Sequence, residues 1–269
     1  MVNLADTLCA FQRPDLHLAV SRIIQRYSTN PLDVRDFALQ GFDPSTARDV
    51  LDLGCGFGFL TETLAPRLPA DARVLGVDAC DANREPFLGR LAAAGRTGEF
   101  LTLHIAQRLP WPAGSFDLIV CSYSLYFFPQ ILRELPRLLR PAGTLLVLTH
   151  WADSLHSLFE ITGIAERDAL LADLVGRFAA EQGAAVLQDH FATVTRRDYR
   201  NALRFPRAQE DDLLLYIQFK LPLLIRGASP SHDVPDVVRD AVRRFLDRHG
   251  EAILEKDDAC FYCRSPRWP

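Results

Sequence analysis

The sequence predicts an α/β fold in which a mostly parallel β-sheet carries helices on both faces. Short apolar runs typical of buried strands alternate with segments of helical spacing along residues 45–150. One of these runs leads directly into a glycine-rich turn, which is followed by another helical segment. Hydrophobic residues make up 48% of the 269 residues, which is enough for a sizeable core.

The expected strands and helices follow from this alternation. Strand-like runs occur at 49–53, 73–78, 99–104, 115–121, 144–149, 191–197 and 259–264. Helical patterns between the first five runs cover 61–68, 81–94 and 130–139. Because right-handed crossovers place the carboxyl ends of parallel strands at one edge of the sheet, we expect ligand-binding residues at that edge.

Further helical segments lie outside this alternating region. Apolar spacing predicts a helix at Leu16–Arg26 and more helix within 153–183. Between the last two expected strands, a helix is predicted over 211–225, broken by Pro222. A second helix is predicted over 234–249, where Gly250 fits the position that terminates a helix.

The stretch from Val50 to Gly58, with the sequence VLDLGCGFG, carries the strongest functional signal. Glycine at every second position permits positive φ angles and lets a ligand lie against bare backbone. Helical spacing begins at Phe59, so N–H groups of the first helical turn are expected near the glycines. A strand, a glycine turn and a helix in this order predict a nucleotide-cofactor site.

The spacing of the glycines distinguishes between cofactors. A dinucleotide-binding turn has the pattern Gly-x-Gly-x-x-Gly. Here the third glycine, Gly58, comes one residue early, and Phe59 occupies its usual place. The turn therefore fits a pyrophosphate poorly, and an NAD-dependent oxidoreductase on a similar sheet is the alternative interpretation.

Three further motifs follow the glycine turn. The run at 73–78 ends in Asp78, about 20 residues after the turn, where an acid reaches a pair of ribose hydroxyls in a βαβ unit. LPWPAGSFDLIV at 109–120 and LLRPAGTLLV at 138–147 come next. Together, residues 45–150 resemble class I S-adenosylmethionine-dependent methyltransferases of small molecules, of the type 11-like group.

The resemblance implies a Rossmann-like sheet of seven strands, the last antiparallel, with a helical cap formed by insertions. It also implies S-adenosylmethionine as cofactor and in-line transfer of its methyl group to an oxygen, nitrogen or carbon atom of a small molecule. A protein that binds S-adenosylmethionine without catalysis, as a scaffold, is a further alternative. We expect one domain over 1–269, with the cofactor-binding core at 45–150 and the cap at 1–44, 151–190 and 198–257.

The resemblance further implies which residues bind the cofactor. Asp78 is expected to bind the ribose, and Gly54 and Gly56 the methionyl part. Family members often carry an aspartate at the position of Ile105, so adenine is expected to contact backbone groups or Gln107 instead. The full expected set is Asp52, Gly54, Cys55, Gly56, Asp78, Ala79, Ala106, Gln107 and Ser122.

Side chains just after the fourth and fifth strands are candidates for the acceptor side. His150 is the candidate general base, because imidazole titrates near neutrality and this position lies at the carboxyl edge of the sheet. A histidine that only caps the next helix is the alternative. Tyr123 is the second candidate, as a hydrogen-bond donor or a stacking group, although simple packing would also explain it. Trp151 together with Tyr123 would suit a cationic acceptor through cation–π attraction.

Charge narrows the range of partners. The formal net charge is −4 and the sequence pI is about 6.0, whereas an enzyme acting on nucleic acid normally has a basic face. Nucleic acid is therefore not expected as a partner. A local group of arginines is either a solvated edge or a binding site for an anionic acceptor: Arg196, Arg197, Arg200, Arg204 and Arg207.

Cysteine usage and hydropathy give the remaining expectations. Cys260 and Cys263 have the spacing of half a zinc site, but no second pair of ligands follows, so no metal is expected and the thiols are expected to be reduced. No apolar run approaches the roughly 18 residues of a membrane helix. The segment Met1–Gln12 has no basic cluster before its apolar residues, which argues against a signal peptide. The expected location is the cytoplasm.

Overall fold

The computed structural model describes residues 13–165, 170–225, 228 and 233–267. Contacts within the chain divide it into two compact units. The sheet unit contains the described parts of Val34–His150, Arg177–Tyr199 and Asp258–Pro269. The helical unit contains the described parts of Met1–Asp33, Trp151–Gly176 and Arg200–Asp257. Residues 34–44 and 177–190, which the sequence assigned to the cap, thus belong to the sheet unit.

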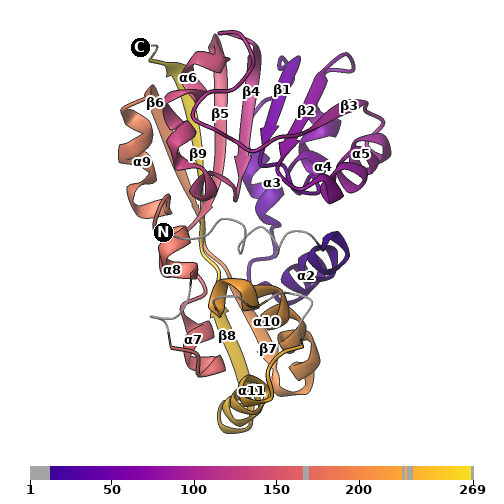
Figure 1. Cartoon of the computed structure of the whole chain (residues 1–269), viewed down its shortest axis with the longest axis vertical. Helices are drawn as coiled ribbons and strands as arrows, with labels where there is room; N and C mark the ends of the chain where they lie inside the picture. Colours follow the sequence, from indigo (N-terminus) through magenta and orange to yellow (C-terminus); the bar gives the residue numbers. More distant parts are fainter. Residues whose placement is uncertain (1–12, 166–169, 226–227, 229–232, 268–269) are drawn as a thin grey trace. The chain divides into compact units, whose positions relative to one another are not determined.

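The sheet unit is built on seven strands, which Figure 1 shows side by side. In spatial order they are β3 (Gly98–Thr102), β2 (Arg73–Asp78), β1 (Asp49–Leu53), β4 (Phe116–Ser122), β5 (Leu139–His150), β9 (Asp258–Pro266) and β6 (Phe191–Tyr199). The pairs from β3 to β5 are parallel, and β9 runs antiparallel to both β5 and β6. The predicted α/β fold is confirmed, including the antiparallel last strand.

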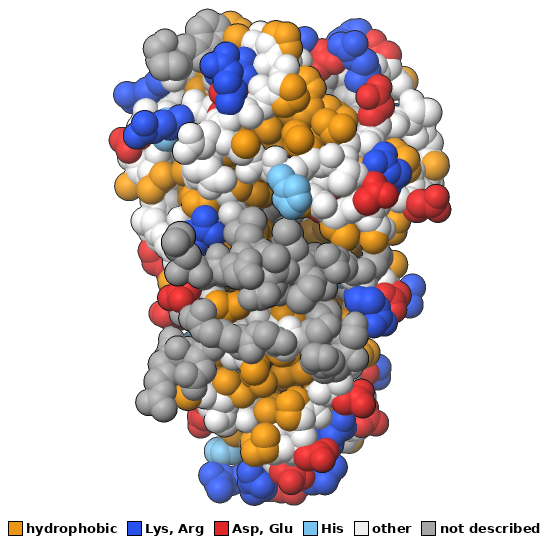
Figure 2. All heavy atoms as spheres, viewed as in Figure 1, with side chains coloured by type: hydrophobic (Ala, Val, Ile, Leu, Met, Phe, Trp, Pro, Cys, Tyr) orange, Lys and Arg blue, Asp and Glu red, His pale blue; other side chains and the backbone are white. Residues whose placement is uncertain are grey.

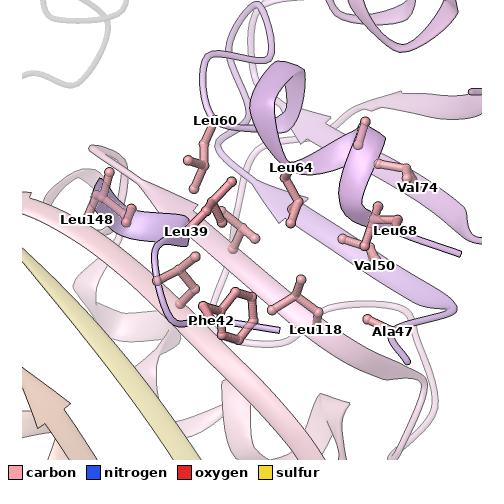
Figure 3. Packing of buried hydrophobic residues seen from close by; sticks show 14 of the residues in the cluster. Leu39, Phe42, Ala47, Val50, Leu60, Leu64, Leu68, Val74, Leu118 and Leu148 are labelled. Carbon is pink, nitrogen blue, oxygen red and sulfur yellow. The ribbon is translucent and has the colours of Figure 1, made fainter. Parts of the chain in front are cut away.

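One face of this sheet is covered by α3 (Val34–Leu39), α4 (Thr61–Leu64) and α5 (Arg84–Ala93). Alternate strand residues point to the same face, and Val50, Leu118 and Leu148 of neighbouring strands form one buried cluster with helix residues (Figure 3). Leu39 of α3 and Leu64 of α4 are among the helix residues of that cluster labelled in Figure 3. The short 3-10 segments η2 (Ala65–Arg67) and η3 (Asp81–Asn83) complete the predicted helical stretches.

The opposite face is covered in part by α9 (Ala180–Gln188). Phe261 lies between Cys260 and Tyr262 on β9, so its ring points to the other side from theirs. It contacts the ring of Phe178, just before α9, with centroids 6.4 Å apart. After β4 come η4 (Leu125–Phe127), η5 (Pro129–Arg133) and α6 (Leu135–Leu138), which lead into β5.

The helical unit contains five helices among its described residues: α2 (Pro14–Tyr27), α7 (Ser157–Thr162), α8 (Leu171–Val175), α10 (Glu210–Leu224) and α11 (Asp236–His249). η7 (Arg207–Gln209) precedes α10. The predicted stop at Gly250 is present, since Gly250 has a φ of +77° and its N–H bonds back to Leu246. Acidic and basic side chains mix on the exposed side of α11 (Figure 2), as on a solvated helix face.

Two details of the helical unit differ from the sequence prediction. β7 (Ala202–Pro206) and β8 (Glu251–Glu255) form a two-stranded antiparallel sheet that was not predicted. Pro222 was expected to break its helix, but α10 continues through it to Leu224. Pro222 removes one helical hydrogen bond because proline has no N–H, and burial of the surrounding apolar side chains outweighs that loss.

In the part of the chain that the structure describes, no helix has both the length and the apolar character needed to cross a membrane.

Candidate functional site

The glycine turn after β1 has the backbone conformation that its sequence predicted. Gly54 and Gly56 have φ angles of +70° and +50°, in the left-handed region that side chains with a Cβ rarely adopt. A Cβ on Gly54 would come within 2.5 Å of the Cβ of Ser124, so glycine is also required there for packing. A Cβ on Gly56 would have no atom of a described residue within 4 Å. Open space beside a bare backbone is what a ligand lying against the turn requires.

Hydrogen bonds fix this turn against the end of β2. The N–H groups of Gly54 and Cys55 donate to the carbonyl oxygen of Val77, at 2.8 and 3.1 Å. The N–H of Gly56 donates to Oδ2 of Asp78 at 2.9 Å. The structure therefore brings the predicted glycine turn and the predicted acid together.

Asp78 is held in place by its own neighbours. Its Oδ1 accepts from the backbone N–H of Cys80 at 2.8 Å and from Nδ2 of Asn83 at 3.3 Å. An ionised carboxylate offers about four acceptor positions. These three donors, counting Gly56, leave capacity for a further hydroxyl donor, so the side chain is both oriented and able to bind a ribose.

Asp52 lies on β1 directly before the turn and is buried, with 1% of its surface exposed. Its Oδ2 accepts a hydrogen bond from Oγ1 of Thr61 at the start of α4, at 2.5 Å. Its Oδ1 is buried and has no hydrogen-bond partner among the described residues. Burial raises the pKa of Asp52 to about 7. A buried oxygen of this kind fits a site for a cationic group of a ligand.

The remaining residues of the expected cofactor set fall into two groups. Ser122 ends β4, and its buried Oγ finds no hydrogen-bond partner within the described ranges. Cys55 is buried in the turn, and burial raises the pKa of its thiol well above the usual range, so it stays protonated. Ala79 follows Asp78 and is half-buried, whereas Ala106 and Gln107 are exposed in the loop after β3. Contacts of these last three residues with a cofactor stay predictions.

The two candidates for the acceptor side lie against each other. Tyr123 follows β4 and His150 ends β5, and their rings stack with centroids 4.6 Å apart and planes 24° apart. They meet because β4 and β5 are parallel neighbours whose carboxyl ends lie at the same edge. Tyr123 has a φ of +54°, a conformation that a residue with a bulky side chain rarely adopts and that is concentrated at functional sites.

A third residue, Asp258, joins this pair and was missed by the sequence prediction. It is the first residue of β9 and lies opposite His150 in the antiparallel β5–β9 pair. Its Oδ1 is 2.6 Å from Nδ1 of His150, and its Oδ2 accepts from the hydroxyl of Tyr123 at 2.9 Å. Its side chain is fully buried. The sequence did offer one signal for Asp258, an acid just before an apolar run. If that run is an antiparallel strand, its first residue lies beside the last residue of the parallel strand next to it.

The arginines that the sequence left between a solvated edge and an anion site are divided between the two units. Arg196 and Arg197 belong to the sheet unit, and the other three belong to the helical unit. Each has a partner within its own unit: Arg196 with Asp198, Arg197 with the carbonyl of Gln40, Arg200 with Asp257, Arg204 with Glu251, and Arg207 with Glu210 and Asp247. This supports the interpretation as ion pairs along solvated edges.

Trp151 also has an internal partner. The guanidinium carbon of Arg200 lies 4.0 Å from the centroid of the Trp151 ring. Trp151 belongs to the helical unit and Tyr123 to the sheet unit. The hypothesis that these two rings together hold a cationic acceptor stays a prediction.

Comparison with known proteins finds a match for the segment that carries the glycine turn, Asp78 and Tyr123. Residues 50–143 match the family model of a methyltransferase domain. This part of the chain is a methyltransferase domain. The match confirms the resemblance to class I S-adenosylmethionine-dependent methyltransferases that the motifs predicted.

Curated relatives match over the same part of the chain. Trans-aconitate 2-methyltransferase of Paracidovorax citrulli is 40% identical over 106 residues, which are 38% of this chain and 39% of that protein. Nocamycin O-methyltransferase of Saccharothrix syringae is 32% identical over 104 residues, which are 38% of this chain and 37% of that protein. The matched segments thus span less than half the length of these relatives.

A solved structure is similar over a longer range. The crystal structure of the YcgJ protein from Bacillus subtilis has a TM-score of 0.55, covers 87% of this chain and 98% of its own, and is 17% identical. At this identity the similarity concerns the fold alone, and it agrees with the seven-stranded sheet described above.

Proposed function

We propose that this protein transfers the methyl group of S-adenosylmethionine to a small-molecule acceptor by in-line displacement. The observation that carries the proposal is the glycine turn with its acid. Gly56 and Asp78 are hydrogen-bonded to each other beside open space, inside the segment that matches the methyltransferase domain.

The residues of the turn fit the parts of this cofactor. Asp78 is proposed to accept from a ribose hydroxyl, and Gly54, Cys55 and Gly56 to line the methionyl part. The partnerless buried oxygen of Asp52 is suited to the methionyl ammonium group, and Ser122 Oγ to a polar group nearby. Ala79, Ala106 and Gln107 are proposed to lie along the adenine, where the position of Ile105 lacks the aspartate common in the family.

The chemistry requires little covalent assistance from the chain. When bound, the sulfonium supplies a methyl group that is already electrophilic. The protein has to hold the acceptor atom in line with the bond to sulfur and to keep water away, and such positioning can supply roughly 7–11 kcal/mol. His150 is proposed to receive the proton of the acceptor.

The match to a methyltransferase domain does not identify the acceptor. The names of the two relatives indicate different acceptors, so the family match alone selects none of them. An anionic acceptor would have to displace the carboxylates and carbonyls that the five arginines already contact. We propose that helical residues outside 50–143 choose the acceptor, because a minimal core of this family lacks them.

Calorimetry with the full-length protein tests the proposed cofactor. S-adenosylmethionine and S-adenosylhomocysteine are expected to bind one site each, and NADH is expected not to bind. Binding of NADH without binding of S-adenosylmethionine would favour the oxidoreductase alternative instead. Turnover of tritiated S-adenosylmethionine with any acceptor would exclude the scaffold alternative.

A further inference from the structure

The contact with Asp258 determines which ring nitrogen of His150 carries the proton. An ionised carboxylate only accepts hydrogen bonds, so the 2.6 Å contact requires the proton on Nδ1 of His150. In the neutral imidazole, Nε2 is then the nitrogen with the lone pair. This nitrogen lies on the side of the ring away from Asp258.

Tyr123 fixes the carboxylate in turn. Its hydroxyl donates to the other oxygen of Asp258 at 2.9 Å, so both carboxylate oxygens are held by different side chains. Burial and the neighbouring Asp258 raise the pKa of Tyr123 well above its usual range, which keeps the hydroxyl protonated as a donor. The Tyr123 ring also stacks on the imidazole of His150. The Tyr126 ring is inclined by 25° to the same imidazole, with ring centroids 6.1 Å apart.

This arrangement lies next to the glycine turn. The Tyr123 ring centroid is 6.1 Å from that of Phe59, the residue that follows Gly58. Ser124, the next residue after Tyr123, contacts the turn itself, since its Oγ donates to the carbonyl of Leu53 at 2.7 Å. His150 is partly accessible, with 12% of its side chain exposed, whereas Asp258 is fully buried.

We propose that Asp258 is the positioning residue for His150, that Nε2 of His150 takes a proton from the acceptor, and that the acceptor is therefore a neutral hydroxyl compound. This inference rests on the proposed methyl transfer. In this proposal, Tyr123 orients Asp258 and so acts on His150 indirectly, without contacting the acceptor. The carboxylate also stabilises the imidazolium that forms when the proton arrives.

The step balances with these groups alone. The acceptor oxygen forms a bond to the methyl carbon, the carbon–sulfur bond breaks, and its electron pair stays on sulfur. The hydroxyl proton moves to Nε2 of His150 and from there to solvent. The products are a methyl ether, S-adenosylhomocysteine and one proton.

Carboxylic acids and amines gain less than hydroxyl compounds from a base at Nε2 of His150. A carboxylic acid is already ionised at neutral pH, since carboxyl groups have ordinary pKa values near 4, and it has no proton for His150 to remove. A neutral amine attacks through its lone pair and can lose its proton afterwards. A protonated amine would bring a second positive charge next to the sulfonium, which is unfavourable.

Nitrogen NMR of histidine in the full-length protein tests the positioning role without any acceptor. The His150 signals are identified by their loss in His150→Gln. At a pH where the ring is neutral, the proton is expected on Nδ1 in the wild type, and a mixture of the two tautomers is expected in Asp258→Asn. A wild-type ring with its proton on Nε2, or an unchanged tautomer in Asp258→Asn, would overturn the proposal.

An acceptor panel tests the substrate class. It consists of phenols, enols and alcohols, each matched with the carboxylic acid and the amine of the same carbon skeleton, and mass spectrometry identifies the products. Methyl ethers are expected, with kcat lowered about 100-fold in His150→Gln and lowered less in Asp258→Asn. The KM for S-adenosylmethionine is expected to stay the same in both. His190→Gln, outside the site, serves as the control and is expected to keep wild-type turnover.

The outcomes separate this inference from the proposed function. Failure of S-adenosylmethionine to bind in calorimetry would refute the proposed function itself. If the cofactor binds, then methyl esters or N-methyl compounds as the main products, or no methylation of any hydroxyl compound, would refute the acceptor class alone. Wild-type kcat in His150→Gln, with melting curves showing a folded protein, would refute the role of the histidine.

Discussion

Asp78 has two tasks at once, because it orients the glycine turn and is proposed to bind the ribose. Asp78→Ala is expected to weaken binding of S-adenosylmethionine by more than tenfold, since each charge-assisted hydrogen bond contributes roughly 1.5–3 kcal/mol. Calorimetry measures this loss. Asp81→Ala, an exposed acid nearby that pairs with Arg84, is the matched control and is expected to bind normally. Equal affinities of wild type and Asp78→Ala would contradict the ribose assignment.

Asp52 gives a prediction on stability against pH. Burial raises its pKa to about 7 in the folded protein, against about 4 in an unfolded chain. A carboxyl group with a raised folded pKa stabilises the fold fully below the unfolded value, and this contribution is lost as the pH rises through the folded value. The free energy of unfolding, relative to Asp52→Asn, is therefore expected to fall between about pH 4 and pH 7 by at most about 4 kcal/mol.

Denaturant titrations of wild type and Asp52→Asn across this pH range give that difference, because all other groups contribute equally to both proteins. A difference that does not change with pH would show that Asp52 is ionised throughout.

At the residue scale, the sequence located the site on the sheet edge but not all of its members. Asp78 and His150 end their strands and Tyr123 directly follows its strand. Periodicity had predicted these strands, so the rule that parallel strands end at one edge placed the three residues at that edge. Asp258 lies 108 positions after His150, and their contact depends on where the antiparallel last strand begins. The acid at the start of that strand was a signal for a residue at this edge, but no local pattern determines the register of the strand.

The glycine turn is the element on which cofactor binding is proposed to depend. Gly56 and Gly114 both have positive φ angles and open space where a Cβ would lie, but only Gly56 faces Asp78. Alanine at either position is expected to cost roughly 1–2 kcal/mol of stability, because L-residues disfavour this conformation. Only Gly56→Ala is expected to lose cofactor affinity, by tenfold or more in calorimetry. Similar affinities for the two variants would place the methionyl part elsewhere.

Other elements show where sequence patterns are too short to be decisive. β7 and β8 have five residues each, with alternating burial around Leu203, Phe205 and Leu254. Five alternating residues also occur by chance in loops, and the two strands are separated by two helices, so their pairing had no local signal. At Pro222 the local sequence was misleading. Proline inside a helix normally breaks it, but burial of the apolar side chains near the end of α10 outweighs this effect.

At the scale of the whole molecule, the proposed base lies where the chain leaves the sheet unit. The chain passes between units at His150–Trp151, Tyr199–Arg200 and Asp257–Asp258. Asp258 pairs with His150 on one side and with Tyr199 on the other, so these three residues form one row across the sheet. Contacts divide the chain into two compact units, and the expected single domain with a helical cap stays a prediction.

Hydrogen exchange tests whether cofactor binding is confined to the sheet unit. A ligand at 100 times its dissociation constant stabilises the bound state by about 2.7 kcal/mol. Slower exchange on addition of S-adenosylhomocysteine is expected at the turn after β1 and at the ends of β2 and β4. Protection found only in α10 and α11 would contradict a site made from the glycine turn.

The most direct measurement is a crystal structure of the full-length protein with S-adenosylhomocysteine. The central claim predicts a ribose hydroxyl within hydrogen-bonding distance of Asp78, the methionyl part against Gly56, and the sulfur on the side of His150. A ligand bound elsewhere, or a ribose held by other side chains while Asp78 keeps only its present partners, would contradict it.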